Sequence, residues 1–292
     1  ESDDVSQSQI SNRIFHSTSL GKSIRVREWH PVGPEKGQVL VLHGLGDHSA
    51  RHDWAASLFT DAGFRAVGFD WPGNGESEGI RGDMPSVSES GRLLQEVTAA
   101  FDLHLTGIYA HSTGAFMLLH WLGSHPSLLS SLKWVWMSSP LLVPSHGQPA
   151  IKIALARFLA PYFPLTTLST GVKPRDCYHT GFDPLADSAL KKAGGHHRVS
   201  LRFATNLLET ETALFAAAES IRSDIQFLVT QGSEDKVCPP PYAERLLENL
   251  PGEKKCLLLV SGSRHEPFRE PDHTGITNAV RSWLNSARDS AL

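Results

Sequence analysis

The sequence has few cysteines, no large excess of charge of one sign and no apolar run long enough to cross a bilayer. Its three cysteines, Cys177, Cys238 and Cys256, lack C-x-x-C spacing, so we expect reduced thiols rather than disulfides or a zinc site. The 27 Lys and Arg residues are scattered and are balanced by 31 Asp and Glu residues, with a formal net charge of −4. This pattern lacks the basic patch of a nucleic-acid-binding protein. The missing apolar run excludes a membrane-spanning protein.

The composition is that of a globular protein, with 40% hydrophobic and 20% charged residues. A length of 292 residues is near the size at which one hydrophobic core stops growing, which predicts one domain with an appended subdomain. Because residues 1–9 are acidic and polar and the chain begins without Met, we expect a processed or trimmed product. A cytoplasmic location is expected, with a removed signal peptide as the open alternative. The oligomeric state is not indicated.

Short β-branched or apolar runs alternate with amphipathic stretches of helical length. We expect strands at 12–17, 24–30, 38–43, 65–70, 106–111, 132–138, 225–231 and 255–260. The alternation predicts an α/β fold with a mostly parallel eight-stranded sheet and helices on both faces.

The alternation stops between Pro140 and Asp224, a stretch too long for one crossover helix. We interpret residues 141–223 as a helical cap inserted after the sixth strand, because ligands of open α/β sheets bind at the carboxyl edge of the strands. Residues 1–140 and 224–292 would then form the core. An ordinary helical layer is the alternative.

Ser112 lies where an expected strand runs directly into an expected helix, in the sequence Ala110-His-Ser112-Thr-Gly114. A sharp strand-to-helix turn strains the backbone, so the residues two positions either side of its centre must be small. Ala110 and Gly114 meet this requirement, although the usual pattern is G-x-S-x-G. Ser112 is therefore a candidate nucleophile.

A serine nucleophile needs a base to take its proton and a carboxylate to orient that base. Asp235 follows the seventh expected strand and His265 follows the eighth. The order Ser, Asp, His on successive strand ends is that of the α/β-hydrolase arrangement. Glu234 is an alternative to Asp235, and Glu266 lies beside the base.

Acyl transfer also needs N–H groups that bind the developing oxyanion. The amide of Thr113, which follows the nucleophile, would be one donor. The glycine-rich turn His43-Gly-Leu45-Gly-Asp47 follows the third expected strand and would supply the Leu45 amide as the second donor. A plain strand-to-helix turn is the alternative.

Longer motifs make the chain, from about Gln38 to its C-terminus, resemble a known family. It is similar to the monoacylglycerol lipase branch of the α/β-hydrolases, which is grouped with serine aminopeptidase-like hydrolases and bacterial lysophospholipases. The motifs are residues 43–51, the D-x-x-G-x-G-x-S-x-G-x-R pattern that begins at Asp70, Ser139-Pro-Leu-Leu142 and Asp183-Pro-Leu185. The branch's G-S-x-D pattern, here ending at Asp235, implies that this aspartate is the triad acid. Cys238 resembles a cysteine close to the site in some members, with a buried inert thiol as the alternative.

The resemblance implies a serine hydrolase that cleaves carboxylic esters of single-chain lipids, above all monoacylglycerols, beneath a mobile apolar cap. The cap would contact a membrane surface transiently, and its Phe158 and Phe163 would contact the acyl chain. Asp47 and Arg51 fall where the branch places polar groups near the glycerol head, with a structural ion pair as the alternative. The run His265-Glu-Pro-Phe lacks the polar residue that members carry after their histidine, which leaves the head group open.

No cofactor or metal is expected. The Gly73-Asn-Gly75 pair lacks the third glycine of the dinucleotide fingerprint, and the histidines lack H-E-x-x-H spacing. Ser112 argues against a dehalogenase or an epoxide hydrolase, which use aspartate at this turn. A carboxylesterase for soluble short-chain esters, a lysophospholipase and a catalytically silent binding module stay open.

Overall fold

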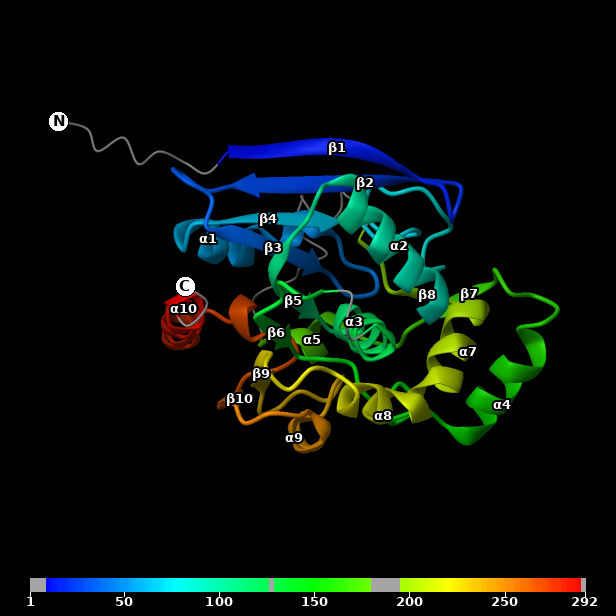
Figure 1. The fold of residues 1–292 in the computed structure, drawn as a ribbon. Coiled ribbons are helices and arrows are strands. Elements are labelled where there is room, and N and C mark those ends of the chain that lie inside the picture. The colour runs from blue at the N-terminus through cyan, green and yellow to red at the C-terminus, as the bar shows by residue number, and fades with distance from the viewer. Residues whose placement is uncertain (1–8, 126–128, 180–194, 290–292) are drawn as a thin grey trace.

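The central element of the fold is an eight-stranded sheet (Figure 1) in the order β1-β2-β4-β3-β5-β6-β9-β10. The computed structural model describes residues 9–125, 129–179 and 195–289, so the Asp183–Leu185 motif lies outside the described residues. The strands are β1 (Gln9–Ser17), β2 (Lys22–His30), β3 (Gly37–Leu42), β4 (Phe64–Phe69), β5 (Leu105–His111), β6 (Trp134–Ser138), β9 (Gln226–Gly232) and β10 (Lys255–Val260). Strand β2 pairs antiparallel with both β1 and β4, and the strands from β4 to β10 in this order run parallel to one another. The expected α/β fold and its eight strands are confirmed.

Helices cover both faces of the sheet. They are α1 (Asp53–Asp61), α2 (Val87–Ala100), α3 (Thr113–Ser124), α4 (Ala150–Leu159), α5 (Pro174–Cys177), α7 (Leu201–Thr210), α8 (Leu214–Glu219), α9 (Pro240–Asn249) and α10 (Thr274–Asp289), with 3-10 turns η1 (Ser49–His52), η2 (Glu211–Ala213) and η3 (Pro267–Arg269). Alternate residues of a strand point to opposite faces. In β3, Leu40 belongs to the core cluster that contains residues of α2, α3, α8 and α9, whereas Val41 belongs to the cluster that contains residues of α1 and α10. A hydrophobic core therefore packs against each face of the sheet.

The 141–223 stretch contains more than helices. Strand β7 (Thr167–Ser169) pairs antiparallel with β8 (Arg198–Ser200), a pairing that the sequence patterns did not predict. Helices α4 and α7 pack together beside the sheet in Figure 1, while α8 packs against α3. A Cβ on Gly123 of α3 would lie 2.3 Å from the carbonyl oxygen of Ala217, so α3 and α8 approach closely. The proposed boundaries of the cap stay a prediction.

No helix in the described ranges combines the length and the apolar character needed to cross a membrane.

Candidate active site

Ser112 stands at the sharp turn between β5 and α3. Its backbone angles, φ 50° and ψ −119°, are rare for a residue other than glycine. A Cβ on Gly114 would lie 2.6 Å from the carbonyl oxygen of His43 and 2.7 Å from that of Leu42, so α3 can begin this close to the end of β3 only with glycine there. The strained turn predicted from the sequence is present, and Ser112 lines a cavity.

The structure brings Ser112, His265 and Asp235 together in one hydrogen-bonded chain. Ser112 Oγ lies 3.2 Å from His265 Nε2, and His265 Nδ1 lies 2.9 Å from Asp235 Oδ2. Because a carboxylate only accepts, Nδ1 carries the proton, and in the neutral imidazole Nε2 is then free to accept the serine proton. The carboxylate of Glu234 is instead 54% exposed and lies 3.8 Å from His179. The geometry therefore favours Asp235 over Glu234 as the partner of His265.

Asp235 is held in place by four donors. Its Oδ1 accepts from the amides of Val237 (2.8 Å) and Cys238 (2.9 Å), and its Oδ2 accepts from Gln231 Nε2 (2.7 Å) as well as from His265. Each oxygen is thus satisfied by two donors in a buried position. This arrangement fixes the carboxylate that orients the imidazole.

The electrostatics of His265 favour its charged form. Burial disfavours the imidazolium, but the adjacent Asp235 carboxylate and the neighbouring Cys238 together outweigh burial and hold the pKa of His265 well above its ordinary value. A base must be neutral to accept a proton, so His265 could act as a base toward Ser112 only above this raised pKa.

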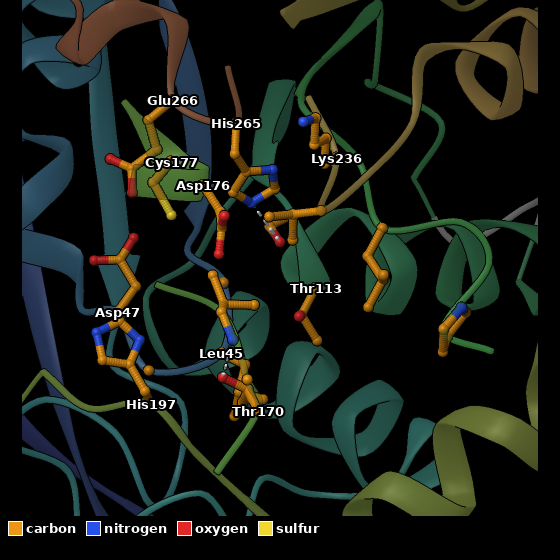
Figure 2. Close-up of a pocket in the computed structure, with 18 of the residues that line it drawn as sticks. Leu45, Asp47, Thr113, Thr170, Asp176, Cys177, His197, Lys236, His265 and Glu266 are labelled. Atoms are coloured by element: carbon orange, nitrogen blue, oxygen red, sulfur yellow. Dashed lines mark hydrogen bonds between the residues drawn. The ribbon is translucent and has the colours of Figure 1, made fainter. Parts of the chain in front are cut away.

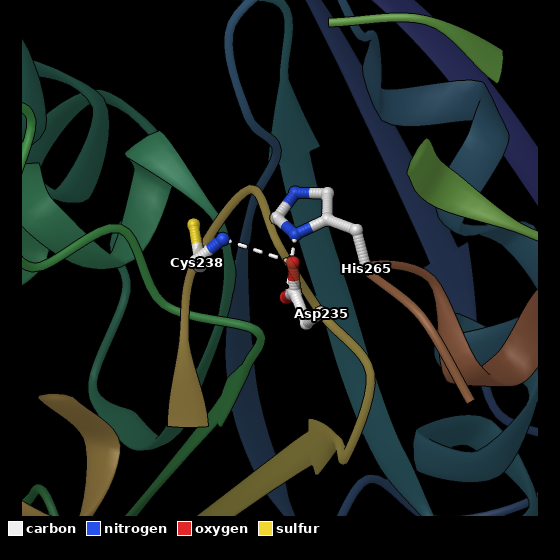
Figure 3. Close-up of side chains that lie close together, drawn as sticks. All are labelled: Asp235, Cys238 and His265. Atoms are coloured by element: carbon white, nitrogen blue, oxygen red, sulfur yellow. Dashed lines mark hydrogen bonds and ion pairs between the residues drawn. The ribbon is translucent and has the colours of Figure 1, made fainter. Parts of the chain in front are cut away.

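Asp235, Cys238 and His265 also form the one group of three potential metal ligands within the described part of the chain (Figure 3), with ligand atoms within 4.8 Å of one another. The Asp235 carboxylate and the His265 imidazole are hydrogen-bonded to each other. Burial raises the pKa of the Cys238 thiol, which favours the neutral form of the thiol. The donors therefore fit a hydrogen-bonded pair beside an inert thiol better than an open metal site.

Leu45 and Thr113 both line the cavity beside the serine turn (Figure 2). Thr113 is the first residue of α3, so its amide has no carbonyl of a preceding helical turn to bind. The Leu45 loop is fixed at its next residue, where the Gly46 amide donates to Asn74 Oδ1 (2.8 Å) and the Gly46 carbonyl accepts from the His196 amide (3.0 Å). Both residues stand beside Ser112, and their role as oxyanion donors stays a prediction.

Asp47 and Arg51 form a buried ion pair at the cavity wall. Arg51 Nη1 lies 3.1 Å from Asp47 Oδ1, and Arg51 Nη2 lies 2.7 Å from Glu266 Oε2. Burial opposes the charge of Arg51, but the two carboxylates hold its pKa well above its ordinary value. The second oxygen of Asp47 lies 2.9 Å from His52 Nε2. The structure thus contains the ion pair that the sequence left as an alternative, and contact of these residues with a head group stays a prediction.

The cavity above the serine has a volume of about 700 Å³ and adjoins a smaller apolar pocket of about 170 Å³. Both share the wall residues Leu45, Leu141, Pro144, Gln148, Lys152 and Thr170. The apolar pocket is lined further by Ile153 and Ala156 of α4 and by Leu201, Ala204, Leu207 and Leu208 of α7. A chamber of mixed polarity that contains the candidate nucleophile therefore borders an apolar pocket between two helices.

Phe158 and Phe163 do not line either space. Their exposed fractions are 67% and 58%, and they lie on the outer surface of the α4 region. The sequence reasoning missed the apolar face of α7, although Leu201, Ala204 and Leu208 recur at the spacing of one helix face. That periodicity could have identified the pocket.

A known protein family and several known proteins match most of the chain. The family described as serine aminopeptidase, S33, matches residues 33–272. The rat monoglyceride lipase is 26% identical over 91% of this chain and 88% of its own length, and the monoacylglycerol lipase of Mycolicibacterium smegmatis is 26% identical over 94% and 98%. An uncharacterized abhydrolase domain-containing protein of Dictyostelium discoideum is 24% identical over 97% of this chain, which spans only 30% of that protein's length.

Solved structures share the fold. The monoacylglycerol lipase of Paleococcus ferrophilus has a TM-score of 0.79 and 28% identity, over 90% of this chain and 99% of that one. A soluble variant of the monoglyceride lipase of Saccharomyces cerevisiae, in complex with a substrate analog, has the same TM-score of 0.79 at 17% identity, over 98% of each chain. At 17% identity, the similarity to the Saccharomyces cerevisiae structure shows a shared fold only.

Proposed function

Because this chain belongs to the serine aminopeptidase S33 family of α/β-hydrolases, we propose that it is a serine hydrolase that cleaves carboxylic esters of single-chain lipids, with monoacylglycerols as its main substrates. Its relatives support the broader class of lipases and esterases. The observation that carries the proposal is the Ser112–His265–Asp235 chain at a cavity that borders an apolar pocket. A fatty acyl chain would occupy that pocket while its ester carbonyl reaches the serine.

In the proposed mechanism, Ser112 Oγ attacks the ester carbonyl carbon while His265 Nε2 takes the hydroxyl proton. The amides of Leu45 and Thr113 stabilise the oxyanion, at about 10²–10³-fold in rate for each donor. The protonated His265 then donates to the leaving alkoxide, and the alcohol departs. Water, activated by the same imidazole, hydrolyses the acyl-enzyme.

The substrate class is tested by fatty-acid release from a long-chain monoacylglycerol below and above its micellar concentration, beside a lysophospholipid and a soluble butyrate ester. The proposal expects the highest kcat/KM for the monoacylglycerol, with a rate that rises once micelles form. Turnover of the butyrate ester alone would make the protein a soluble carboxylesterase. Preference for the lysophospholipid would make it a lysophospholipase, and no turnover of any ester would favour a binding module.

The apolar pocket yields a prediction about chain length. Ala204 of α7 lines the pocket, so Ala204→Phe should fill part of its roughly 170 Å³. We expect kcat/KM for a long-chain monoacylglycerol to fall about tenfold or more, since losing the burial of a few methylene groups costs about 0.8 kcal/mol each. Activity on the butyrate ester should be unchanged. The measurement is kcat/KM across a series of acyl lengths.

The matched control is Ala99→Phe, because Ala99 is exposed on α2, away from the α4 region, and does not line the pocket. An equal loss in both variants, or an unchanged chain-length profile in Ala204→Phe, would show that the acyl chain lies elsewhere.

We also propose that the outer face of the α4 region contacts a lipid surface. Its exposed large apolar residues are Ile151, Leu155, Phe158, Tyr162, Phe163, Leu165 and Leu168. Exposed apolar patches of this kind mark interaction sites. Phe158→Glu should lower the hydrolysis of monoacylglycerol in phosphatidylcholine vesicles about tenfold, because a phenylalanine side chain gains roughly 1.5–3 kcal/mol on burial.

Hydrolysis of the soluble butyrate ester by Phe158→Glu should stay at the wild-type rate. Val32→Glu changes a side chain that is 63% exposed and lies in another part of the chain, and it serves as the control. Full vesicle activity in Phe158→Glu would contradict the contact.

A further inference from the structure

The loop that carries His265 is tied to the segment 174–179 through Arg264. Arg264 Nη1 donates to the carbonyl oxygens of Arg175 (2.6 Å) and Tyr178 (2.9 Å). These carbonyls lie in and just after α5, and carbonyls at the end of a helix lack partners within the helix. A guanidinium can satisfy two such carbonyls at once and so joins the two segments.

The residue on the other side of His265 is bound to the same segment. The Glu266 amide donates to the carbonyl oxygen of Cys177 (3.0 Å). Further along the loop, Glu270 Oε1 lies 2.9 Å from His179 Nδ1. The segment 174–179 therefore binds both neighbours of His265, Arg264 through its side chain and Glu266 through its backbone amide.

The hydrogen bond between His265 and Ser112 depends on the position of this loop and tolerates little increase in its length. His265 Nε2 lies 3.2 Å from Ser112 Oγ, at the long end of the distance over which a base takes a proton. A misplacement of about 1 Å in a reacting group can cost about 10²-fold in rate. The position of the loop is thus as important to the reaction as the identity of the base.

We propose that Arg264 is a positioning residue that holds the His265 loop against the segment 174–179 and keeps the imidazole within reach of Ser112. The inference rests on the proposed function, in which His265 is the base. Arg264 touches neither the substrate nor the reacting atoms in this account. It acts by fixing the backbone of His265. In this way the segment 174–179, which lies between β6 and β9, helps to position the catalytic base.

The test is the kinetics of Arg264→Ala and Arg264→Lys on the preferred ester. We expect Arg264→Ala to lower kcat about 10- to 100-fold with KM changed less than twofold, since the acyl pocket is untouched. Arg264→Lys, whose ammonium can donate to the same carbonyls, should recover a large part of the loss. The low-field proton NMR signal of the His265 Nδ1–H to Asp235 bond should broaden in Arg264→Ala and persist in Arg264→Lys.

The matched control is Arg222→Ala. Arg222 also donates to two backbone carbonyls, those of Leu129 (2.5 Å) and Leu132 (3.2 Å), away from the site. Its removal should leave kcat and the low-field signal unchanged. If Arg264→Ala does not fold, Arg264→Met, which keeps an unbranched side chain but has no donor for either carbonyl, takes its place with the same expected loss.

The inference is overturned if kcat stays within twofold of wild type in Arg264→Ala, if Arg264→Lys recovers nothing, or if Arg222→Ala loses as much. Ser112→Ala in the same assay separates this failure from that of the proposed function. Loss of turnover in Ser112→Ala with wild-type kcat in Arg264→Ala rejects only the positioning role, whereas turnover in Ser112→Ala rejects the proposed function itself.

Discussion

Replacing Ser112 by alanine is expected to lower kcat for ester hydrolysis by about 10⁴-fold or more, which corresponds to roughly 5 kcal/mol of transition-state stabilisation. The physical reason is the loss of the oxygen that lies 3.2 Å from His265 Nε2 and that would form the acyl-enzyme in the proposed mechanism. The substrate pocket and the two backbone amides are unchanged, so substrate should still bind. The measurements are steady-state kinetics and binding of a non-hydrolysable ether analogue.

Stability provides the control for this variant. Alanine keeps the Cβ at the turn, so the melting temperature of Ser112→Ala should match that of the wild type. Ser88→Ala, in the exposed first turn of α2, is a matched serine replacement away from the site and should keep full activity. Turnover by Ser112→Ala at more than a hundredth of the wild-type rate would reject Ser112 as the nucleophile.

Asp235→Asn should lower kcat about 10⁴-fold, as expected when the orienting carboxylate of a triad becomes an amide. The amides of Val237 and Cys238 both donate to Oδ1, so the asparagine oxygen should take that position. Its NH₂ group would then face His265 Nδ1, which could no longer donate. The imidazole would carry its proton on Nε2 and could not accept one from the serine.

The pH profile of Asp235→Asn gives an independent readout. Asp235 raises the pKa of His265, and the wild-type kcat/KM should rise with pH through that raised value, because only neutral imidazole accepts the proton. Without the carboxylate the pKa of His265 falls, so the residual activity should rise at lower pH than in the wild type. Glu234→Gln, which changes a half-exposed carboxylate, is the control. An Asp235→Asn variant within tenfold of wild-type kcat would contradict the triad.

Much of the fold could be predicted from the sequence because its signals are local. The buried strands are short apolar runs bounded by turns, and every expected strand is present in the sheet. The turn at Ser112 was recognisable because close approach of backbone demands small neighbours, which Gly114 confirms. The order of Ser112, Asp235 and His265 along the chain sufficed to group them, since parallel strands end at one edge.

The parts that escaped prediction depend on contacts between distant segments. The bonds from Arg264 to the carbonyls near α5 span 86–89 residues and leave no periodic pattern. The pairing of β7 with β8 joins segments of three residues, too short to show an alternation. Phe158 and Phe163 were expected to contact the acyl chain because they are apolar residues of the cap, but apolarity does not tell which residues of the α4 region face outward.

The most direct test of the central claim is to label the protein with a fluorophosphonate probe and to locate the adduct by peptide mass spectrometry. The proposed mechanism predicts a single adduct on Ser112, slowed by a long-chain monoacylglycerol and lost in His265→Ala. Ester hydrolysis that continues without labelling of Ser112, or an adduct on another residue that accounts for the inhibition, would contradict it.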